Sequence, residues 1–308
     1  MRQCMAYIEV DSKKIYTEEY GKDNCRTIII FHGGPAASCR GFENLAEALS
    51  DKYHVICFDQ YGVSRSDAIH EDEPFGMTEH IKQIDKMREV FNVSSWTLIG
   101  HSYGGMLACL YAHTYPQNTE AVIYVGATWD FGLSARAQAA YLIPYFSRIN
   151  SQEGLQKCIE LINNKLGTTT EIRDFFMSFV VPLVKDFREL CFYHKSIDEM
   201  ENIPTREYNT PPEPENASQK SLVHIQKLRE GGEVYDNYYP YLNKIDKPSL
   251  FIIGKYDPLG GQYERDCFLK NAPKGKVVEL NNSGHFPHKE EPQLFTRAVI
   301  DFMDSLYN

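Results

Sequence analysis

The stretch Trp96–Leu107, WTLIGHSYGGML, decides the fold because it joins a strand, a sharp turn and the start of a helix. WTLIG is a continuous apolar run, which is typical of a buried strand. Gly100, Ser102 and Gly104 follow as G-x-S-x-G, a pattern that exposes a serine hydroxyl on a tight turn where flanking side chains would clash. We therefore predict that Ser102 is a nucleophile at the end of a strand. A glycine-rich turn with an ordinary serine is the simpler interpretation.

Other apolar runs in the chain have the composition of buried strands. Most are rich in β-branched residues and bounded by Gly or Pro, as is typical of a parallel sheet, and helical segments separate them. The sequence therefore predicts an α/β fold, with a mostly parallel eight-stranded sheet flanked by helices. The expected strands are Ala6–Val10, Lys14–Tyr20, Thr27–Phe31, His54–Phe58, Trp96–Gly100, Ala121–Gly126, Pro248–Gly254 and Lys276–Leu280.

Two helical segments show clear apolar faces. The first starts near Thr78, and the last opens at Pro292, a residue suited to the first turn of a helix. The buried faces that we expect are Ile81, Ile84, Met87 and Phe91 in the first helix, and Leu294, Ala298, Phe302 and Leu306 in the last.

The alternation of strands and helices stops between Thr128 and Asn243. This stretch has helical patterning, no convincing strand, and a loop rich in Pro, Glu and Asn at Thr205–Ala217. We predict a core domain of residues 1–127 and 244–308 and an inserted helical cap of residues 128–243. The cap is expected to close over Ser102 and set specificity, with a few of its many aromatic residues facing the nucleophile.

A serine is a weak nucleophile without a neighbouring base. FIIGKYDP places Asp257 just past one expected strand, and LNNSGHFPH places His285 just past the next. Because the carboxyl ends of parallel strands meet at one sheet edge, we predict that Asp257 orients His285, the general base for Ser102. Asp257 could instead be a turn residue. His288 competes with His285, but it lies nearer the last helix and is expected at the surface.

Two more loops follow expected strands. In Phe31–Ser38, FHGGPAAS, the glycines let backbone N–H groups face the site, although a tight turn alone would also explain them. We assign the two oxyanion donors to the backbone N–H groups of Gly34 and Tyr103. His101 is expected to support the turn around the nucleophile rather than act as the base. The loop Phe58–Asp67, FDQYGVSRSD, most simply braces the sheet edge.

Taken in order, HGGP, DQYGVSRS, GHSYGG, GKYDP and SGHF resemble the α/β-hydrolase superfamily, and in particular its proline iminopeptidase branch. The resemblance covers about residues 5–127 and 247–306. It implies the α/β-hydrolase fold with an inserted cap, and chemistry through an acyl-enzyme. The chain departs from the branch at Ala36, where HGGPG is usual, and at Tyr61 and Val63, where DQRG-x-G-x-S is usual. Its GHSYG replaces the frequent GGSWG and is also common in ester hydrolases.

The resemblance implies an aminopeptidase that releases N-terminal proline or another small residue from short peptides. The alternative is a hydrolase of carboxylic esters, thioesters or lactones with the same triad. A third reading, a non-catalytic binding protein of this fold, would be expected to lack a triad member. Enzymes of the branch are expected to bind the protonated α-amine with cap carboxylates. The acidic cluster at Asp198 makes Glu199 and Glu201 the first candidates for substrate binding.

The composition of the chain disfavours several classes of binding partner. The net charge of −10 disfavours nucleic acid and anionic membranes. No run reaches the roughly 18 apolar residues of a membrane helix, and the N-terminus lacks the apolar region of a signal peptide. The eight cysteines lack CxxC or zinc-type spacing, which favours reduced thiols and a cytoplasmic location. We expect a small-molecule or short-peptide substrate, no metal and no cofactor; the sequence leaves the oligomeric state open.

Overall fold

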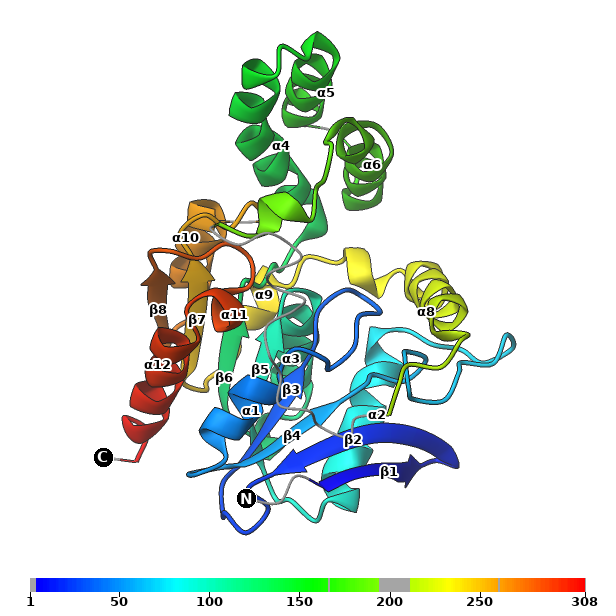
Figure 1. Ribbon diagram of the computed structural model, residues 1–308, viewed down its shortest axis with the longest axis vertical. Helices are drawn as coiled ribbons and strands as arrows, with labels where there is room; N and C mark the ends of the chain where they lie inside the picture. The colour runs from blue at the N-terminus through cyan, green and yellow to red at the C-terminus, as the bar shows by residue number, and fades with distance from the viewer. Residues whose placement is uncertain (1–3, 166, 194–210, 260, 308) are drawn as a thin grey trace.

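An eight-stranded sheet forms the centre of the protein, as seen in the computed structural model, which describes residues 4–165, 167–193, 211–259 and 261–307 (Figure 1). The strand order is β1-β2-β4-β3-β5-β6-β7-β8. The pairs β1–β2 and β2–β4 are antiparallel and the others are parallel. The predicted α/β class with a mostly parallel eight-stranded sheet is confirmed. The strands are β1 Cys4–Val10, β2 Lys13–Tyr20, β3 Thr27–Phe31, β4 His54–Phe58, β5 Trp96–His101, β6 Thr119–Val125, β7 Ser249–Gly254 and β8 Gly275–Leu280.

Helices cover both faces of this sheet, which explains why its central strands are apolar throughout. Every residue of β3, β4, β5 and β7 is buried, and each large aliphatic side chain so buried contributes about 1.5–3 kcal/mol. Side chains of alternate strand positions enter two separate cores. One face packs on α2 Met77–Val90, α3 Tyr103–Thr114, α9 Tyr239–Leu242 and α10 Gly261–Asn271, and the other on α1 Glu43–Leu49 and α12 Pro292–Asp304.

The stretch from Thr128 to Asn243, called the insertion below, holds helices and no strand among its described residues. Three of its helices share a small core of their own and project beyond the sheet, while a fourth lies apart from them (Figure 1). The predicted domain boundaries at residues 127 and 244 stay a prediction. These four helices are α4 Phe131–Arg148, α5 Gln152–Asn163, α6 Thr169–Phe175 and α8 Ala217–Gly231, and the insertion ends with the short α9, which packs on the sheet.

The last helix buries Phe302 as expected, with Ala298 and Leu306 partly buried, but its buried face is shifted at the first turn. Leu294 is 57% exposed, whereas Phe295 and Val299 are buried against the sheet. A helical period of 3.6 residues fits either stripe, and the larger Phe295 takes the inward position. The prediction was therefore wrong at Leu294. In α2 the expected apolar face is buried, with Phe91 partly buried at its end.

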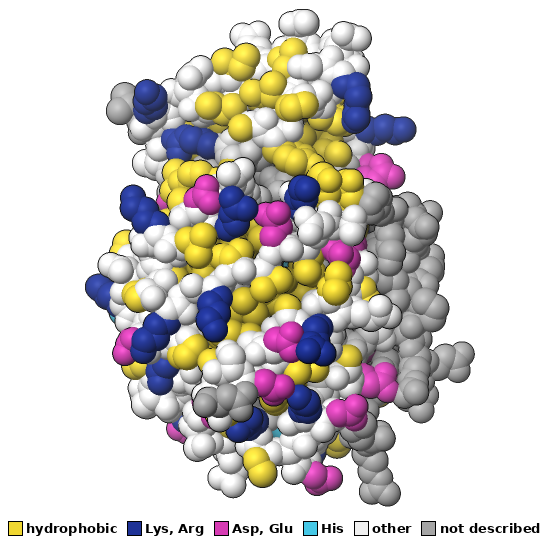
Figure 2. All heavy atoms as spheres, turned by 90° about the vertical axis from the view of Figure 1, so that its left-hand side faces the viewer, with side chains coloured by type: hydrophobic (Ala, Val, Ile, Leu, Met, Phe, Trp, Pro, Cys, Tyr) yellow, Lys and Arg dark blue, Asp and Glu magenta, His cyan; other side chains and the backbone are white. Residues whose placement is uncertain are grey.

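The insertion also exposes apolar side chains. On the face shown in Figure 2, hydrophobic side chains are visible among dispersed acidic and basic ones. Large exposed residues of the insertion include Tyr141, Ile149, Met177 and Phe179. Its aromatic side chains are thus divided among its own core, the core beneath the sheet and the surface.

Candidate active site

Ser102 lies on the sharp turn between β5 and α3. Its backbone adopts φ 53° and ψ −121°, a conformation that L residues rarely take and that costs about 1–3 kcal/mol. The turn is held because the Ser102 N–H donates to the Val125 carbonyl at 2.9 Å. A side chain at Gly104 would overlap the backbone of Phe31, so the close approach of α3 to β3 requires a glycine there. The turn thus has the shape that presents a serine hydroxyl at the sheet edge.

Asp257 and His285 meet at the same edge. Asp257 follows β7 and His285 follows β8, and each is only 4% exposed. Nδ1 of His285 lies 3.0 Å from Oδ2 and 3.2 Å from Oδ1 of Asp257. With the carboxylate ionised, Nδ1 is the donor, and this leaves Nε2 as the nitrogen that can accept a proton. A second donor, the Leu259 N–H, fixes the carboxylate at 2.8 Å.

Gly126 is a site residue that the sequence reasoning missed. It follows β6 with a φ of +49°, and a Cβ there would come within 3.0 Å of both Asp257 Oδ2 and His285 Nδ1. A glycine is therefore needed beside this pair. The available signal was the glycine that ends the apolar run AVIYVG.

Ser102 and His285 line one cavity of about 940 Å³. The structure gives no hydrogen bond between the Ser102 hydroxyl and His285, two residues that it describes fully. Such bonds are often long without substrate and tighten when substrate binds. The positions of Ser102, Asp257 and His285 are as expected, and their catalytic roles stay a prediction.

His101 supports the loop of the candidate base. Its Nε2 donates to the His285 carbonyl at 3.0 Å, and the two rings lie 4.8 Å apart. Burial, together with the nearby charge of His285, holds the pKa of His101 well below its usual value. A neutral ring at this position suits the supporting role that the sequence indicates.

The two candidate oxyanion donors come from the loop after β3 and from the residue that follows Ser102. Gly34 lines the cavity with a φ of +125°, and Tyr103 is the first residue of α3. Within the described part of the chain, neither backbone N–H makes a hydrogen bond. Both are therefore available to a substrate oxygen, and their role stays a prediction.

The loop after β4 braces the glycine-rich loop after β3. Asp59 accepts the Cys39 N–H at 2.9 Å, and the Gln60 side chain donates to the His32 carbonyl at 2.9 Å. Arg65 contacts both Asp59 oxygens, at 2.6 and 2.9 Å, in a buried pair. Burial alone would raise the pKa of Asp59, but its hydrogen bonds and the Arg65 charge hold it below its usual value. The bracing role expected for this loop agrees with these contacts.

His288 is buried rather than exposed, so the expectation of a surface position was wrong. The residue is 6% exposed, and its ring stacks on Phe42 at 4.7 Å and meets Phe295 edge-on. The reason is that α11 Pro287–Glu290 folds back onto α12 and onto Phe42 at the start of α1, so this short helix turns its imidazole inward. His285, and not His288, contacts Asp257.

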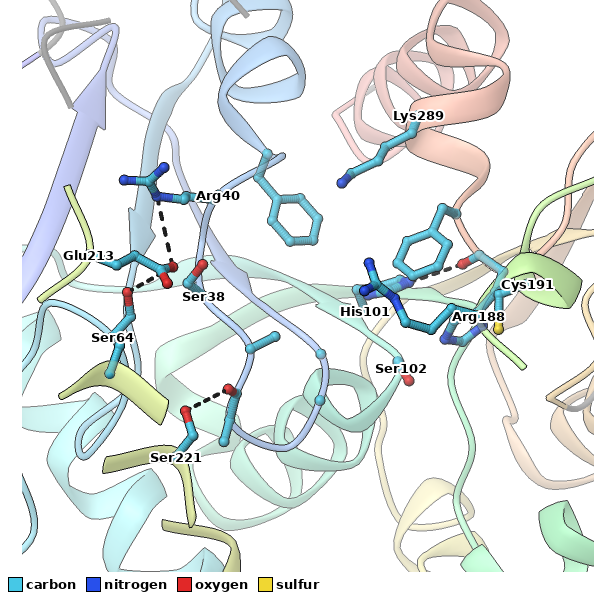
Figure 3. Close-up of a pocket in the computed structure, with 18 of the residues that line it drawn as sticks. Ser38, Arg40, Ser64, His101, Ser102, Arg188, Cys191, Glu213, Ser221 and Lys289 are labelled. Atoms are coloured by element: carbon cyan, nitrogen blue, oxygen red, sulfur yellow. Dashed lines mark hydrogen bonds and ion pairs between the residues drawn. The ribbon is translucent and has the colours of Figure 1, made fainter. Parts of the chain in front are cut away.

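The insertion supplies a carboxylate to the cavity, but from an unexpected place. Glu199 and Glu201 lie outside the described residues. Glu213 lines the cavity, accepts from the Ser64 hydroxyl at 3.1 Å and lies 3.8 Å from Arg40 Nε (Figure 3). Its setting, the Pro- and Glu-rich loop PPEPENA, gave no local signal of a site.

The expectation that aromatic residues of the insertion would face the nucleophile was wrong for the residues that the structure describes. The insertion gives the cavity only non-aromatic side chains among the described residues, including Arg188, Cys191 and Ser221, and the aromatic lining comes from the core. Phe192 stacks instead on Phe286 at 4.7 Å. The aromatic side chains of the insertion lie instead in its own core, in the core beneath the sheet, on loops of the main domain or at the surface.

Two further features of the described residues concern membranes and metals. No helix among them is long and apolar enough to span a membrane. They also contain no group of three His, Cys, Asp or Glu side chains placed to hold a metal ion. A reaction without metal or cofactor remains an expectation.

Comparison with known proteins places these features in context. A family model described as alpha/beta hydrolase fold matches residues 26–292. The chain is 24% identical to a proline iminopeptidase of Heyndrickxia coagulans, covering 97% of this chain and 98% of the relative. It is 25% identical to a proline iminopeptidase of Saccharolobus solfataricus, covering 98% and 93%. A proline iminopeptidase-related protein of Thermus thermophilus is similar in structure, with a TM-score of 0.65, 19% identity and 99% coverage of both chains. This structural likeness shows the fold alone.

Proposed function

The chain belongs to the α/β-hydrolase family, and from this premise we propose that it is a serine hydrolase that works through an acyl-enzyme. One observation carries the proposal: His285, which is paired with the buried Asp257 carboxylate, lines the same cavity as a serine held in a strained strand-to-helix turn. A nucleophile, a base and a group that orients the base are the parts that acyl transfer requires.

In the proposed mechanism Ser102 Oγ attacks the substrate carbonyl and gives its proton to Nε2 of His285. Asp257 keeps the other ring nitrogen protonated and stabilises the imidazolium. The backbone N–H groups of Gly34 and Tyr103 stabilise the oxyanion, and losing one such donor typically costs about 2.7–4 kcal/mol of transition-state stabilisation. His285 then protonates the leaving group, and water, activated by the same histidine, hydrolyses the acyl-enzyme.

We favour an aminopeptidase that releases N-terminal proline or another small residue from short peptides. Two observations support this choice. The proline iminopeptidases named above align along nearly the whole chain. Glu213 also brings a carboxylate to the cavity, where it can face a protonated α-amine, a group that needs a counter-charge when it leaves water.

A hydrolase of carboxylic esters, thioesters or lactones is the second candidate. It is supported by the engagement of Glu213 with Arg40 and Ser64, which reduces the charge that Glu213 offers to an amine. The serine turn GHSYG also matches a pattern common in ester hydrolases.

A panel of three substrates separates the candidates: a prolyl amide with a free amine, its N-acetylated analogue and a short acyl ester. We expect the free-amine substrate to exceed its blocked analogue by well over tenfold in kcat/KM. In Glu213→Gln this ratio should fall to about threefold or less, because the counter-charge is lost. Glu215→Gln, two residues along the same loop, serves as the matched control. Equal rates for the free and blocked substrates, or faster turnover of the ester, would favour the esterase.

We also propose a cytoplasmic location. All eight cysteines are unpaired, and five of them are buried in the protein. Unpaired thiols persist where the compartment is reducing.

A further inference from the structure

Glu264 is a carboxylic acid buried where the two ends of the insertion meet. It belongs to α10, and its side chain is fully shielded from solvent. The hydroxyl of Thr128, the first residue of the insertion, hydrogen-bonds to one carboxyl oxygen at 2.8 Å, and the hydroxyl of Tyr239 in α9 contacts the other. Beside these contacts the Tyr238 N–H donates to the Trp129 carbonyl at 2.8 Å. A single side chain of the core therefore joins both ends of the insertion.

Thr128 ends a segment of four residues, 125–128, that runs alongside the candidate site. The Val125 carbonyl accepts the backbone N–H of the candidate nucleophile at 2.9 Å, and a Cβ at Gly126 would lie 3.0 Å from both the candidate acid and the candidate base. Ala127 packs closely against a glycine of α3, the helix that follows the nucleophile. Because Thr128 is only two residues from Gly126, a shift of its backbone also displaces that glycine.

Burial decides the charge state of Glu264. It raises the pKa of this carboxyl to about 8; the hydrogen bonds of Tyr239 and Thr128 lower the pKa, and the negative charges of Asp130 and Asp257 raise it further. At neutral pH the group is therefore mainly the uncharged acid, which avoids the cost of a charge in the interior. Hydroxyl groups both donate and accept, so the two partners would also satisfy a neutral amide.

We infer that Glu264 is a positioning residue that fixes segment 125–128 and thereby the arrangement of the nucleophile, the acid and the base. It acts through Thr128 rather than on the reacting atoms. The inference rests on the proposed function, in which a proton passes from the serine to the histidine. A displacement of about 1 Å at such a site can lower the rate about 100-fold. Loss of the contact should therefore lower kcat and leave KM nearly unchanged.

Substitutions on both sides of the contact test the inference, with the member of the three-substrate panel that the wild-type protein cleaves fastest. Thr128→Val removes the hydroxyl and keeps the shape of the side chain, so kcat should fall about 10- to 100-fold with KM within about threefold. Glu264→Leu should reproduce this loss. Thr128→Ser and Glu264→Gln preserve the hydrogen bond and should keep kcat within about threefold of wild type. Equal losses in the conservative and the disruptive variants would overturn the inference.

Thr119→Val is the matched control. Thr119 opens strand β6, at the end away from segment 125–128; it is buried, and its hydroxyl donates to the Tyr115 carbonyl at 3.1 Å. Like Thr128→Val, this variant loses a buried hydroxyl that is hydrogen-bonded, so the two should lose similar amounts of stability in urea denaturation. Only Thr128→Val should lose kcat. Equal kcat in the two variants, or a kcat of Thr128→Val within twofold of wild type, contradicts the positioning role.

A spectroscopic measurement separates this inference from the proposed function. The Nδ1 proton that His285 shares with Asp257 is followed by its far-downfield proton NMR resonance, which Asp257→Asn identifies by removing it. The resonance should shift in Thr128→Val and stay in place in Thr128→Ser and Thr119→Val. An unchanged resonance in Thr128→Val overturns the inference, whatever the activity. If the wild-type protein cleaves no substrate but the resonance shifts as expected, the positioning role stands and the hydrolase proposal fails.

Discussion

The two walls of the cavity are held in different ways. On the wall built by the sheet edge, Asp257 and His285 are almost fully buried, and Ser102 is fixed between a strand and a helix. On the wall built by the insertion, Arg188 and Glu213 are exposed and lie outside any α-helix or strand. From this difference we propose that the sheet edge carries the chemistry, which needs fixed geometry, and that the insertion selects the substrate.

One ion pair at each wall shows the same contrast, because the two pairs differ in burial and therefore in the cost of breaking them. Asp59 and Arg65, beneath the glycine-rich loop, are at most 1% exposed. Arg40 and Glu213, across the cavity mouth, are each 43% exposed. Breaking a buried pair leaves an uncompensated charge in the protein interior, whereas water screens an exposed one.

The largest effect is expected from a substitution on the sheet-edge wall that lowers catalytic activity and leaves the fold unchanged. Asp257→Asn should lower kcat about 10³- to 10⁴-fold, because the amide no longer holds the required tautomer of His285. The unfolding temperature should change little. Asp301→Asn, on the exposed face of α12, is the matched control and should retain full activity. An Asp257→Asn variant with more than half of the wild-type rate would show that another group orients the base.

The second prediction compares the two ion pairs directly. Arg65→Met should lower the free energy of unfolding by about 3–5 kcal/mol, because Asp59 is left buried without its partner. Arg40→Met should change it by about 1 kcal/mol or less. Urea denaturation of both variants measures the difference. Equal losses of unfolding free energy in the two variants would mean that the two ion pairs stabilise the fold equally, contrary to the contrast between the walls.

The third prediction concerns pH at the contact between α2 and α8, where the insertion meets the core. His80 and His224 lie with ring centroids 5.7 Å apart, and within the described residues neither His80 nitrogen nor Nε2 of His224 has a hydrogen-bond partner. Burial lowers the pKa of His224 to about 4 and that of His80 well below its usual value. Because these folded-state pKa values are depressed, the unfolded chain binds protons first as the pH falls.

The stability contributed by neutral His224 is therefore complete above about pH 6.5 and is lost as the pH falls toward 4. One proton corresponds to a slope of about 1.4 kcal/mol per pH unit. His224→Gln should remove about one proton from the slope of the unfolding free energy between pH 6.5 and 4, measured by urea denaturation. Exposed His70→Gln is the control, and an unchanged slope in His224→Gln would contradict the assignment.

Much of the sheet edge could be predicted from sequence, for a physical reason. Parallel strands are covered on both faces, so β3, β5 and β7 read as unbroken apolar runs. The loops after such strands converge by topology, which brought Asp257 to His285. The tight turn at Ser102 needs glycines that are visible in the sequence.

The rest depends on tertiary packing that leaves no local pattern. The helical period fits two apolar stripes of α12, and the sequence prediction chose the stripe with Leu294, whereas the structure buries Phe295. His288 is buried only because a short helix folds back. Glu213 reaches the cavity from a polar, Pro-rich loop whose composition is that of any exposed linker.

The most direct test of the proposed chemistry is to locate the nucleophile by covalent labelling. The wild-type protein is treated with a fluorophosphonate, digested, and mapped by mass spectrometry, with Ser102→Ala treated in parallel. We predict one adduct, on the peptide that contains Ser102, and no labelling of the variant even though it remains folded. An adduct on another residue, or labelling of Ser102→Ala at the wild-type rate, would contradict the assignment of Ser102 as the nucleophile.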